Sequence, residues 1–410
     1  MIPRKGRMTM NLYLNKNEKA SANAVVLDDL FLTKDMPTTG GSKMLDGYMS
    51  LFDAEVISRL ADAGYDIAGK ANVGEFSVDL LGETSHYGAC VKDDGTFTNA
   101  SAEILNGGDV TAALCMDING TPRRAAALCG KAYIKPTYGT VSRYGTIAIA
   151  CSGETVGVMA NTVADCSKVL SAIAGHDDKD GTSLSEAECA QVKAGAEFTK
   201  VKKIAVAKSI VDTADEAAKA KIAHFREVMS AQGVEFAEID DTDLTLAKTA
   251  WNVCMSAELC NNVSRFDGVK YGYRTKNYKT IDELYTNSRT EAFGELLKSV
   301  ILFGSETLST DNYMKMYDKS LRIRRVVAEA FAEIFKEFDA VLMPACAKTS
   351  YTMDDVKANK YLSFDEALYT APASLTGLPA AVIGGVQLIG KAFSDNALLD
   401  AAAAFEKEDK

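Results

Sequence analysis

Residues 203–239 read KIAVAKSIVDTADEAAKAKIAHFREVMSAQGVEFAEI, and this stretch carries the clearest fold signal in the chain. Its two ends, 203–208 and 234–239, are short apolar runs of the length and composition typical of buried strands. The segment between them places its large apolar side chains on one face of a helix, namely Ile222, Phe225, Val228 and Met229. A strand, a helix and a second strand in this order indicate a parallel crossover unit, so we predict an α/β fold.

The same helix and strand signals recur on both sides of this unit. The longest helical pattern runs from about residue 313 to 338, and we expect a last helix from Ser394. Further β-compatible runs occupy 340–343 and 386–389. Capping boxes predict helix starts, and they occur at 162–165, 213–216, 280–283 and 363–366.

The composition indicates a globular chain. Of 410 residues, 47% are hydrophobic and 25% are charged, which excludes a disordered or fibrous protein. No apolar run reaches the ~18 residues of a membrane helix, and the N-terminus lacks the apolar core of a secretory signal. The net charge of −11 gives no electrostatic reason to expect strong autonomous nucleic-acid binding. We expect residues 1–20 to be flexible and 21–410 to form a single domain.

The cysteines and the glycine-rich segments indicate neither a metal nor a cofactor. The nine cysteines are scattered without a CxxC pair, and there are only three histidines, so we expect reduced thiols in a cytoplasmic protein and no metal site. The chain also contains no GxxxxGK[ST] loop, no GxGxxG after a strand and no GxSxG elbow. We therefore expect no bound cofactor.

Several segments spread over the chain resemble the amidase signature family. They are Met36-Pro-Thr-Thr39, Ser42-Lys-Met-Leu45, Gly69-Lys-Ala-Asn72, Lys135-Pro-Thr-Tyr-Gly139, Val141-Ser-Arg-Tyr-Gly145 and Leu375-Thr-Gly-Leu-Pro379. Two more, at 265–274 and 289–294, are similar to the tRNA-dependent amidotransferase branch of that family, formed by its A subunits. The resemblance implies an α/β amidase-signature fold, in which a central mixed β-sheet is covered by helices on both faces.

The resemblance also implies a catalytic lysine, a middle serine and a nucleophilic serine, but this chain departs from that pattern. The three positions are assigned to Leu27, Phe97 and Thr121. A hydrocarbon side chain cannot move a proton, and losing single members of such a triad costs on the order of 10⁴–10⁶ in kcat. The oxyanion-hole loop corresponds to Ile118, Asn119 and Gly120, where backbone N–H groups would donate.

The family's substrate anchors are also altered. The positions of its tyrosine, arginine and aspartate correspond to Trp251, Val300 and Ala367, although a register shift of one residue would bring Glu366 to the last position. A zwitterionic substrate needs countercharges in a dry pocket, and valine and alanine supply none.

Three other sets of residues have side chains of the types found in active sites. They are Thr121 activated by Lys131 or Lys135, a pair of His86 with Cys115 or Cys129, and Asp117 acting with Arg123 and Arg124. In the simpler interpretation, Thr121 is a polar residue without a catalytic role, the two cysteines are buried thiols, and Asp117 forms a structural ion pair with the arginines.

Three functional hypotheses follow. The preferred one is a catalytically degenerate A-subunit homologue, that is, a non-hydrolysing subunit or pseudoamidase. The second is an active amidase or glutaminase that supplies ammonia for Glu-tRNA(Gln) or Asp-tRNA(Asn) transamidation through a rebuilt site. The third is a scaffold that docks the transamidase B and C subunits or a full-length A subunit. We expect neither direct nucleic-acid binding nor membrane binding.

Overall fold

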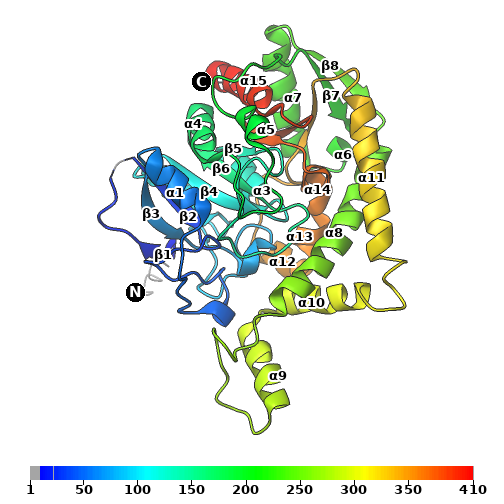
Figure 1. Ribbon diagram of the computed structural model, residues 1–410. Helices are drawn as coiled ribbons and strands as arrows, with labels where there is room; N and C mark the ends of the chain where they lie inside the picture. Colours follow the sequence, from blue (N-terminus) through cyan, green and yellow to red (C-terminus); the bar gives the residue numbers. More distant parts are fainter. Residues whose placement is uncertain (1–9, 22, 410) are drawn as a thin grey trace, which may run out of the picture.

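The computed structural model describes residues 10–21 and 23–409 and has the mixed α/β architecture expected from the sequence (Figure 1). Its strands are β1 (Tyr13–Lys16), β2 (Ala24–Asp28), β3 (Asp66–Ala71), β4 (Ala112–Asp117), β5 (Ala132–Lys135), β6 (Thr155–Ala160), β7 (Lys203–Ala207), β8 (Glu235–Ile239), β9 (Ala340–Pro344), β10 (Ala380–Ile383) and β11 (Val386–Gly390). Within the described residues these form one sheet in the order β1-β3-β2-β4-β6-β5-β10-β11-β9-β7-β8. β2 pairs in parallel with β3 and β4, and β7 with β8 and β9, while the other pairs are antiparallel.

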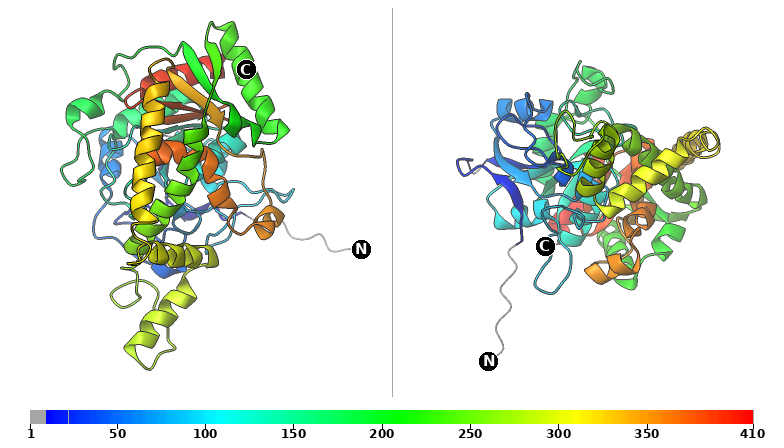
Figure 2. Two further views of the ribbon diagram at one scale, coloured as in Figure 1. Left: turned by 90° about the vertical axis from the view of Figure 1, so that its right-hand side faces the viewer. Right: turned by 90° about the horizontal axis from the view of Figure 1, so that it is seen from below.

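Helices cover this sheet and extend beyond one end of it (Figure 2). They are α1 (Glu55–Asp62), α2 (Ala100–Gly107), α3 (Thr121–Cys129), α4 (Val163–Ile173), α5 (Glu186–Ala190), α6 (Lys208–Asp212), α7 (Glu216–Ala231), α8 (Thr242–Val263), α9 (Ile281–Ala292), α10 (Glu295–Thr307), α11 (Tyr317–Ile334), α12 (Met353–Ala358), α13 (Leu362–Asp365), α14 (Ala367–Thr376) and α15 (Asp395–Glu408), with short 3₁₀ turns η1 (Lys43–Leu45) and η2 (Glu75–Ser77). Across the described part of the chain, no helix combines the length and the apolar character needed to cross a membrane.

The central strands of the sheet are buried on both faces. On β2, Val25 and Leu27 join a large apolar cluster that includes residues of α4, α7, α8 and α15, whereas Ala24 and Val26 join a smaller cluster that includes residues of α2 and α3. Successive strand residues point to opposite faces, so a strand buried on both sides reads as a continuous apolar run. The expected central mixed sheet with helices on both faces is therefore confirmed.

A projecting segment leaves this body and carries α9 (Figures 1 and 2). We call residues 265–293 the arm. It begins just after α8 ends and returns to the body just before α10 begins. α8 itself packs against α10, α11 and α14.

Several local predictions are confirmed and others are wrong. β7 and β8 are parallel neighbours around α7, as the 203–239 pattern predicts, and the side chains of Thr162 and Thr280 cap α4 and α9. However, α7 is capped by Asp215 and not by Thr213, and Ser363 lies inside α13. The longest described helix is α8 and not the 313–338 segment, because α11 ends at Ile334.

The N-terminal boundary also needs correction. Residues 1–9 of the segment expected to be flexible lie outside the described residues, but Tyr13–Lys16 forms β1 at the edge of the sheet. The strand pairs antiparallel with β3, with an irregular register between Tyr13 and Asn15. A short, polar, bulged edge strand lacks the apolar alternation by which strands are predicted, so sequence reasoning misses it.

A glycine in the middle of the sheet generates a stability prediction. A Cβ at Gly157 of β6 would lie 2.0 Å from the Tyr133 hydroxyl and 2.8 Å from the Ile134 carbonyl oxygen. Gly157→Ala is therefore expected to lower the free energy of unfolding by about 1–3 kcal/mol through overpacking. Gly181→Ala is the matched control, because a Cβ there meets nothing within 4 Å. Urea denaturation of both variants tests this, and equal midpoints would contradict it.

Candidate functional site

Thr121 occupies the first position of α3, directly after the loop that follows β4. The loop turns at Gly120, whose φ of 82° lies in the left-handed region. A Cβ at Gly120 would lie 2.3 Å from the Thr370 side chain, so only glycine fits this close approach to α14. The loop and α14 together fix where the Thr121 side chain points.

The Thr121 hydroxyl is buried and is hydrogen-bonded to the backbone. It donates a hydrogen bond to the Asp79 carbonyl oxygen at 2.7 Å, and the Ser77 carbonyl oxygen lies 3.5 Å away. Lys131 instead bonds Asn106 and Asn161, and Lys135 bonds the Leu378 carbonyl oxygen. Neither lysine is in place to take the proton of Thr121.

The first arginine of α3 forms the structural ion pair expected from the sequence. Nε and Nη2 of Arg123 bond the two carboxylate oxygens of Asp117 at 2.8 and 2.9 Å, and both side chains are fully buried. Burial acts to raise the pKa of Asp117, but Arg123 outweighs it and leaves that pKa below its usual value. The remaining guanidinium protons are donated to the Thr370 carbonyl, Gln387 and Ser374.

The second arginine does not join this ion pair. Arg124 is also fully buried, and it donates to the carbonyl oxygens of Asp79, Leu80 and Asn119 at 2.8 to 3.1 Å. Its Nη2 lies 3.4 Å from the Thr121 hydroxyl oxygen. A guanidinium stays protonated in proteins, so this neighbour donates to Thr121 and cannot act as its base.

The structure does not bring Leu27 to Thr121. Leu27 belongs to the large apolar cluster, while the next residue, Asp28, lines a small cavity together with Thr121 and Cys115. Adjacent residues of a strand point to opposite faces, so a shift of one position changes the face completely. The expectation for Leu27 is therefore corrected: Asp28 is the β2 residue that faces Thr121.

A buried lysine does lie near Leu27, but it faces away from this cavity. Lys70 pairs with Leu27 across β2 and β3. Its amino group donates to the Phe31 carbonyl oxygen and the Thr38 hydroxyl and forms an ion pair with Asp29. Burial lowers its pKa to about 8 despite the attraction of Asp29. The residues that line the Thr121 cavity include no lysine.

Asp28 is held by neutral partners. Its carboxylate oxygens accept hydrogen bonds from the Ser101 hydroxyl at 2.9 Å and from the Met116 N–H at 3.2 Å. Burial raises the pKa of Asp28 to about 7, because those two bonds only partly compensate for the lost water. The nearby Cys115 thiol has a pKa raised well above its usual value, also by burial.

Phe97 packs as a hydrophobic side chain and is not among the residues that line the Thr121 cavity. It is 5% exposed and joins the smaller apolar cluster with Leu81, Cys90 and Tyr351. Its backbone N–H donates to the Tyr351 carbonyl oxygen at 2.8 Å. The loop is thereby fixed to the segment that follows β9.

The cavity beside Thr121 is too small for a substrate. Its volume is about 10 Å³, and its lining residues are Asp28, Val73, Gly74, Ser77, Asn99, Cys115, Thr121 and Pro122. A water molecule needs about 10–15 Å³ by this measure. The cavity therefore holds one water at most, and no amide substrate.

The oxyanion-hole-like loop, formed by Ile118, Asn119 and Gly120, is closed by its own side chain. The Asn119 amide donates to the carbonyl oxygens of Val78 and Ser363 at 3.3 and 3.2 Å. The Asn119 side chain thus connects the end of η2 to α13 and covers the loop. The asparagine adopts a negative φ, so it fits the loop without strain.

The three substrate-anchor candidates are all buried in the large apolar cluster. Trp251 of α8, Val300 of α10 and Ala367 of α14 are each no more than 2% exposed. Trp251 packs against Gly153, where a Cβ would lie 2.4 Å from its ring. The tryptophan thus fills space in the core.

Glu366, the alternative anchor, serves the backbone. Its carboxylate accepts a hydrogen bond from the Ala347 N–H at 2.8 Å. Burial raises its pKa above the usual value, although Ala347, Tyr351 and Arg124 partly offset this effect. This carboxylate therefore holds the segment after β9 in place.

The cysteine–histidine hypothesis does not fit the structure. All nine cysteines are free thiols, and the His86 ring contacts the Tyr87 ring and not a thiol. Burial raises the pKa of the Cys115 thiol, so it is a poor nucleophile. In the described residues, no group of three or more histidine, cysteine or acidic side chains is placed to hold a metal ion.

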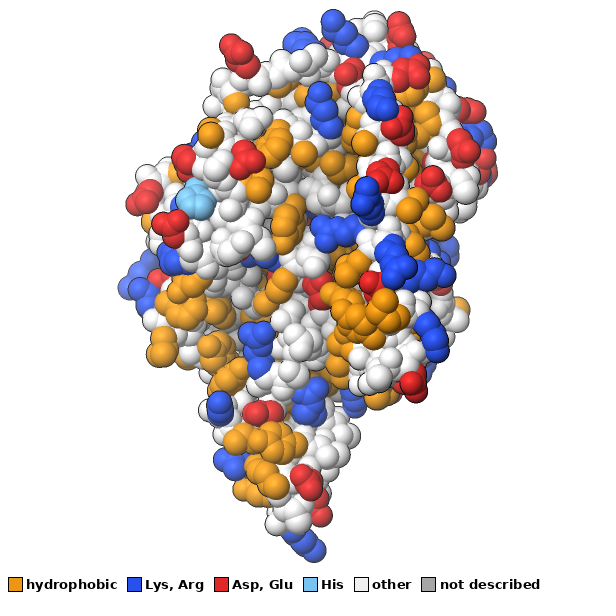
Figure 3. All heavy atoms as spheres, turned by 45° about the vertical axis from the view of Figure 1, so that its right-hand side comes forward, with side chains coloured by type: hydrophobic (Ala, Val, Ile, Leu, Met, Phe, Trp, Pro, Cys, Tyr) orange, Lys and Arg blue, Asp and Glu red, His pale blue; other side chains and the backbone are white. Residues whose placement is uncertain are grey.

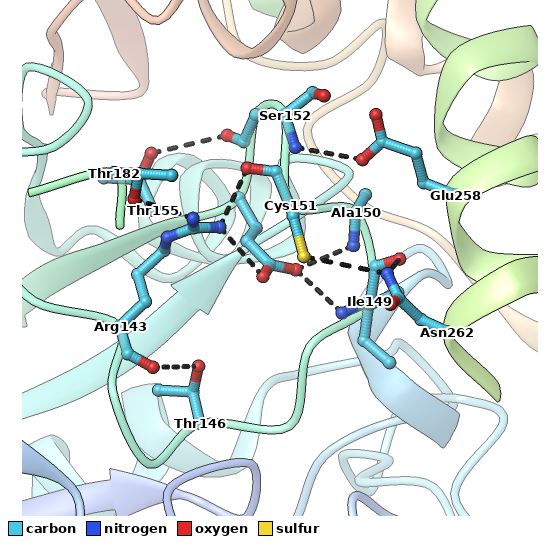
Figure 4. A network of polar contacts seen from close by, with 12 residues as sticks. Arg143, Thr146, Ile149, Ala150, Cys151, Ser152, Thr155, Thr182, Glu258 and Asn262 are labelled. Atoms are coloured by element: carbon cyan, nitrogen blue, oxygen red, sulfur yellow. Dashed lines mark hydrogen bonds and ion pairs between the residues drawn. The ribbon is translucent and has the colours of Figure 1, made fainter. Parts of the chain in front are cut away.

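A second buried polar network lies on the loop after β5 (Figure 4). Arg143 bonds Glu154 at 3.0 Å and the Cys151 carbonyl oxygen at 2.8 Å. Glu154 accepts the N–H groups of Ile149 and Ala150, and α8 joins through Glu258, which accepts the Ser152 N–H. These groups bond one another, so the network fixes the loop beneath Trp251.

The comparisons with known proteins agree with this architecture. A family model described as Amidase matches residues 24–399. The A subunit of the glutamyl-tRNA(Gln) amidotransferase of Agathobacter rectalis is 34% identical over 400 residues, covering 93% of this chain and 80% of that protein. Its counterpart from Latilactobacillus sakei is 35% identical over 398 residues, covering 93% and 81%.

Solved structures share the fold. The crystal structure of the glutamyl-tRNA(Gln) amidotransferase A subunit from Thermotoga maritima has a TM-score of 0.79 at 26% identity, covering 97% of this chain and 87% of that chain. Kluyveromyces lactis allophanate hydrolase has a TM-score of 0.78 at 22% identity, covering 95% and 62%.

The buried Asp28 generates a pH prediction. Its pKa of about 7 in the folded chain exceeds the ~3.9 of an unfolded aspartate, so folding favours the protonated form, and stability is lost as the pH rises from about 4 to 7. Asp28→Asn cannot ionise. Its stability relative to the wild type should rise by on the order of 2 kcal/mol between about pH 5 and pH 8.

Urea denaturation at several pH values measures this difference, and Asp35→Asn, at an exposed position, is the control. Parallel pH profiles for the wild type and Asp28→Asn would contradict the buried, mostly neutral carboxyl.

Proposed function

This chain belongs to the amidase family, and we propose that it is a catalytically silent homologue of the glutamyl-tRNA(Gln) amidotransferase A subunit. The observation that carries the proposal is the state of Thr121. Its hydroxyl donates to a backbone carbonyl, its nearest cation is a guanidinium, and the cavity beside it holds one water at most. An acyl-transfer enzyme needs a base on the nucleophile and room for the substrate, and both are missing at this position.

We further propose that Asp28, and not Leu27, stands where the family has its catalytic lysine. Asp28 is the β2 residue that faces Thr121. A carboxyl with a pKa of about 7 is in principle a usable base. However, its oxygens are bonded to Ser101 and Met116 and not to Thr121, which counts against a rebuilt site.

The former substrate pocket supports the same conclusion. Glutamine carries both an ammonium and a carboxylate, which need countercharges once they leave water. Trp251, Val300 and Ala367 supply no charge and are packed within the core. Arg124 and the Asn119 side chain occupy the space around the nucleophile loop. Substrate would have to displace buried, hydrogen-bonded groups to enter.

A subunit that does not hydrolyse glutamine can still keep the surface that contacts its partner subunits. We propose that this protein acts in the cytoplasm by association with transamidase B and C subunits or with a full-length A subunit. The large side chains exposed on α10 and near the start of α11 support a role in assembly: Leu302 is 72% exposed and Met314 is 59% exposed. Free thiols throughout the chain fit a reducing compartment.

The proposal predicts the absence of Thr121-dependent glutamine hydrolysis. Purified protein incubated with glutamine should release no ammonia above the rate seen with Thr121→Ala, because loss of triad members costs on the order of 10⁴–10⁶ in kcat. The Thermotoga maritima relative serves as the assay reference. A screen of small amides with the same ammonia readout extends the test to the rebuilt-site alternative, and turnover abolished by Thr121→Ala would contradict silence.

The assembly role predicts a stable complex. Co-expression with the transamidase B and C subunits of the same cell, followed by size-exclusion chromatography, should yield co-elution. Leu302→Ser with Met314→Ser should weaken that complex without altering the fold, because both side chains are exposed. Lys319→Ser, at an exposed position of α11, is the control. Separate elution from B, C and full-length A would contradict the role.

A further inference from the structure

Although the chain has a net negative charge, the arm contains a strongly basic segment. Residues 265–279 contain five cations and only one acid, Asp267. All five cations are exposed, and none makes an ion pair among the described residues. They are Arg265, Lys270, Arg274, Lys276 and Lys279. Figure 3 shows the arm as the tapering lower end of the molecule, where basic, acidic and hydrophobic side chains lie side by side.

The arm holds these cations on a fixed frame. The Tyr273 N–H donates to the Met44 carbonyl oxygen at 2.7 Å, which joins the arm to η1. Glu291 of α9 accepts the hydroxyls of Tyr273 and Thr275 at 2.6 and 2.9 Å. Arg265 bonds only the neutral oxygens of Asn262. Of the three acids of α9, Glu291 is thus used internally, Glu283 accepts the backbone N–H of Lys279, and Asp282 is exposed. None of them forms an ion pair with the five cations among the described residues, so the charges of the cations remain available to an external anion.

Aromatic side chains are interleaved with the cations. Tyr271 and Tyr278 are 37% and 43% exposed, and Arg274 lies over the Tyr278 ring at 5.7 Å. The Tyr48 and Tyr271 rings are 5.5 Å apart. They border a cavity of about 130 Å³ at the base of the arm, which Arg265 and Phe266 also line. This cavity offers aromatic faces beside a guanidinium, the surroundings in which a planar base stacks.

We propose that the arm binds single-stranded RNA. The cations follow a phosphate backbone, the exposed tyrosines stack on bases, and one base enters the cavity beside Arg265. RNA is favoured over DNA because the hydroxyls of Tyr271 and Tyr278 have no partner among the described residues and can bond a ribose 2′-hydroxyl.

An acidic protein surface is the competing occupant, and the composition of the arm argues against it. Lysine is depleted in the cores of protein–protein interfaces, whereas three of the five exposed cations here are lysines. Because the rest of the chain is acidic, it repels a polyanion and confines the contact to the arm. Binding is therefore expected to be strongly salt-dependent.

The test uses the full chain and a fluorescent single-stranded RNA of mixed sequence, about 20 nucleotides long, with affinity measured by anisotropy between about 50 and 200 mM salt. The wild type should bind, with affinity falling steeply as salt rises. Replacing Lys270, Arg274, Lys276 and Lys279 by Ser should lower affinity at least ~10-fold and reduce the salt slope by about 3, at ~0.7 per phosphate contact.

Two matched controls keep the result specific. Replacing Lys19, Lys202, Lys315 and Lys391 by Ser removes the same charge from exposed sites outside the arm, and affinity should stay within about twofold. Tyr278→Ala should cost about tenfold through lost stacking, whereas Tyr313→Ala, at an exposed tyrosine outside the arm, should not. Circular dichroism of each variant verifies its fold.

Several outcomes would overturn the proposal: no binding at low salt, equal losses in both fourfold variants, or single-stranded DNA of the same sequence bound as tightly as RNA. Polyglutamate binding as tightly as RNA would instead assign the arm to an acidic protein. None of these outcomes bears on the ammonia assay, so catalytic silence and RNA binding are tested separately.

Discussion

The buried Asp117–Arg123 ion pair is the interaction on which the rest of the site depends. Its two parallel hydrogen bonds join the end of β4 to the first turn of α3, and the same guanidinium reaches α14 and β11 through Thr370, Ser374 and Gln387. Breaking a buried pair leaves an unpaired charge that costs about 3–5 kcal/mol. The loop between β4 and α3 is therefore held in one conformation, with Gly120 against Thr370.

Around that fixed loop, the side chains form a packed, hydrogen-bonded core. Arg124 and Asn119 donate to backbone carbonyl groups beside the loop, and the Asp28 carboxyl accepts a hydrogen bond from Ser101. These hydrogen bonds are all made within the chain, so the arrangement holds without a ligand, and only Oδ1 of Asn119 is left without a partner among these groups. A scaffold can keep its shape after losing its chemistry, because folding depends on packing and turnover depends on a few proton-transfer groups.

The sequence predicted the sheet class and the 203–239 crossover. Both rest on local apolar periodicity, which a single sequence carries. It did not predict that Asp28 and not Leu27 faces Thr121, because an error of one residue in a strand exchanges its two faces. Nor did it reveal that Arg124 donates to backbone carbonyl groups, since those of Asp79 and Leu80 lie 45 and 44 residues away in the chain. The basic segment of the arm was not apparent from the composition, because the net charge of −11 describes the whole chain and not these fifteen residues.

The central claim is that the start of α3 has neither a reactive nucleophile nor a cavity large enough for a substrate. An electrophilic glutamine analogue, such as a diazoketone, tests this most directly, since it alkylates an activated hydroxyl that it can reach. Intact-mass measurement after incubation should show the unmodified mass for this chain and a single adduct for the Thermotoga maritima relative. An adduct on this chain that maps to Thr121 would contradict the account.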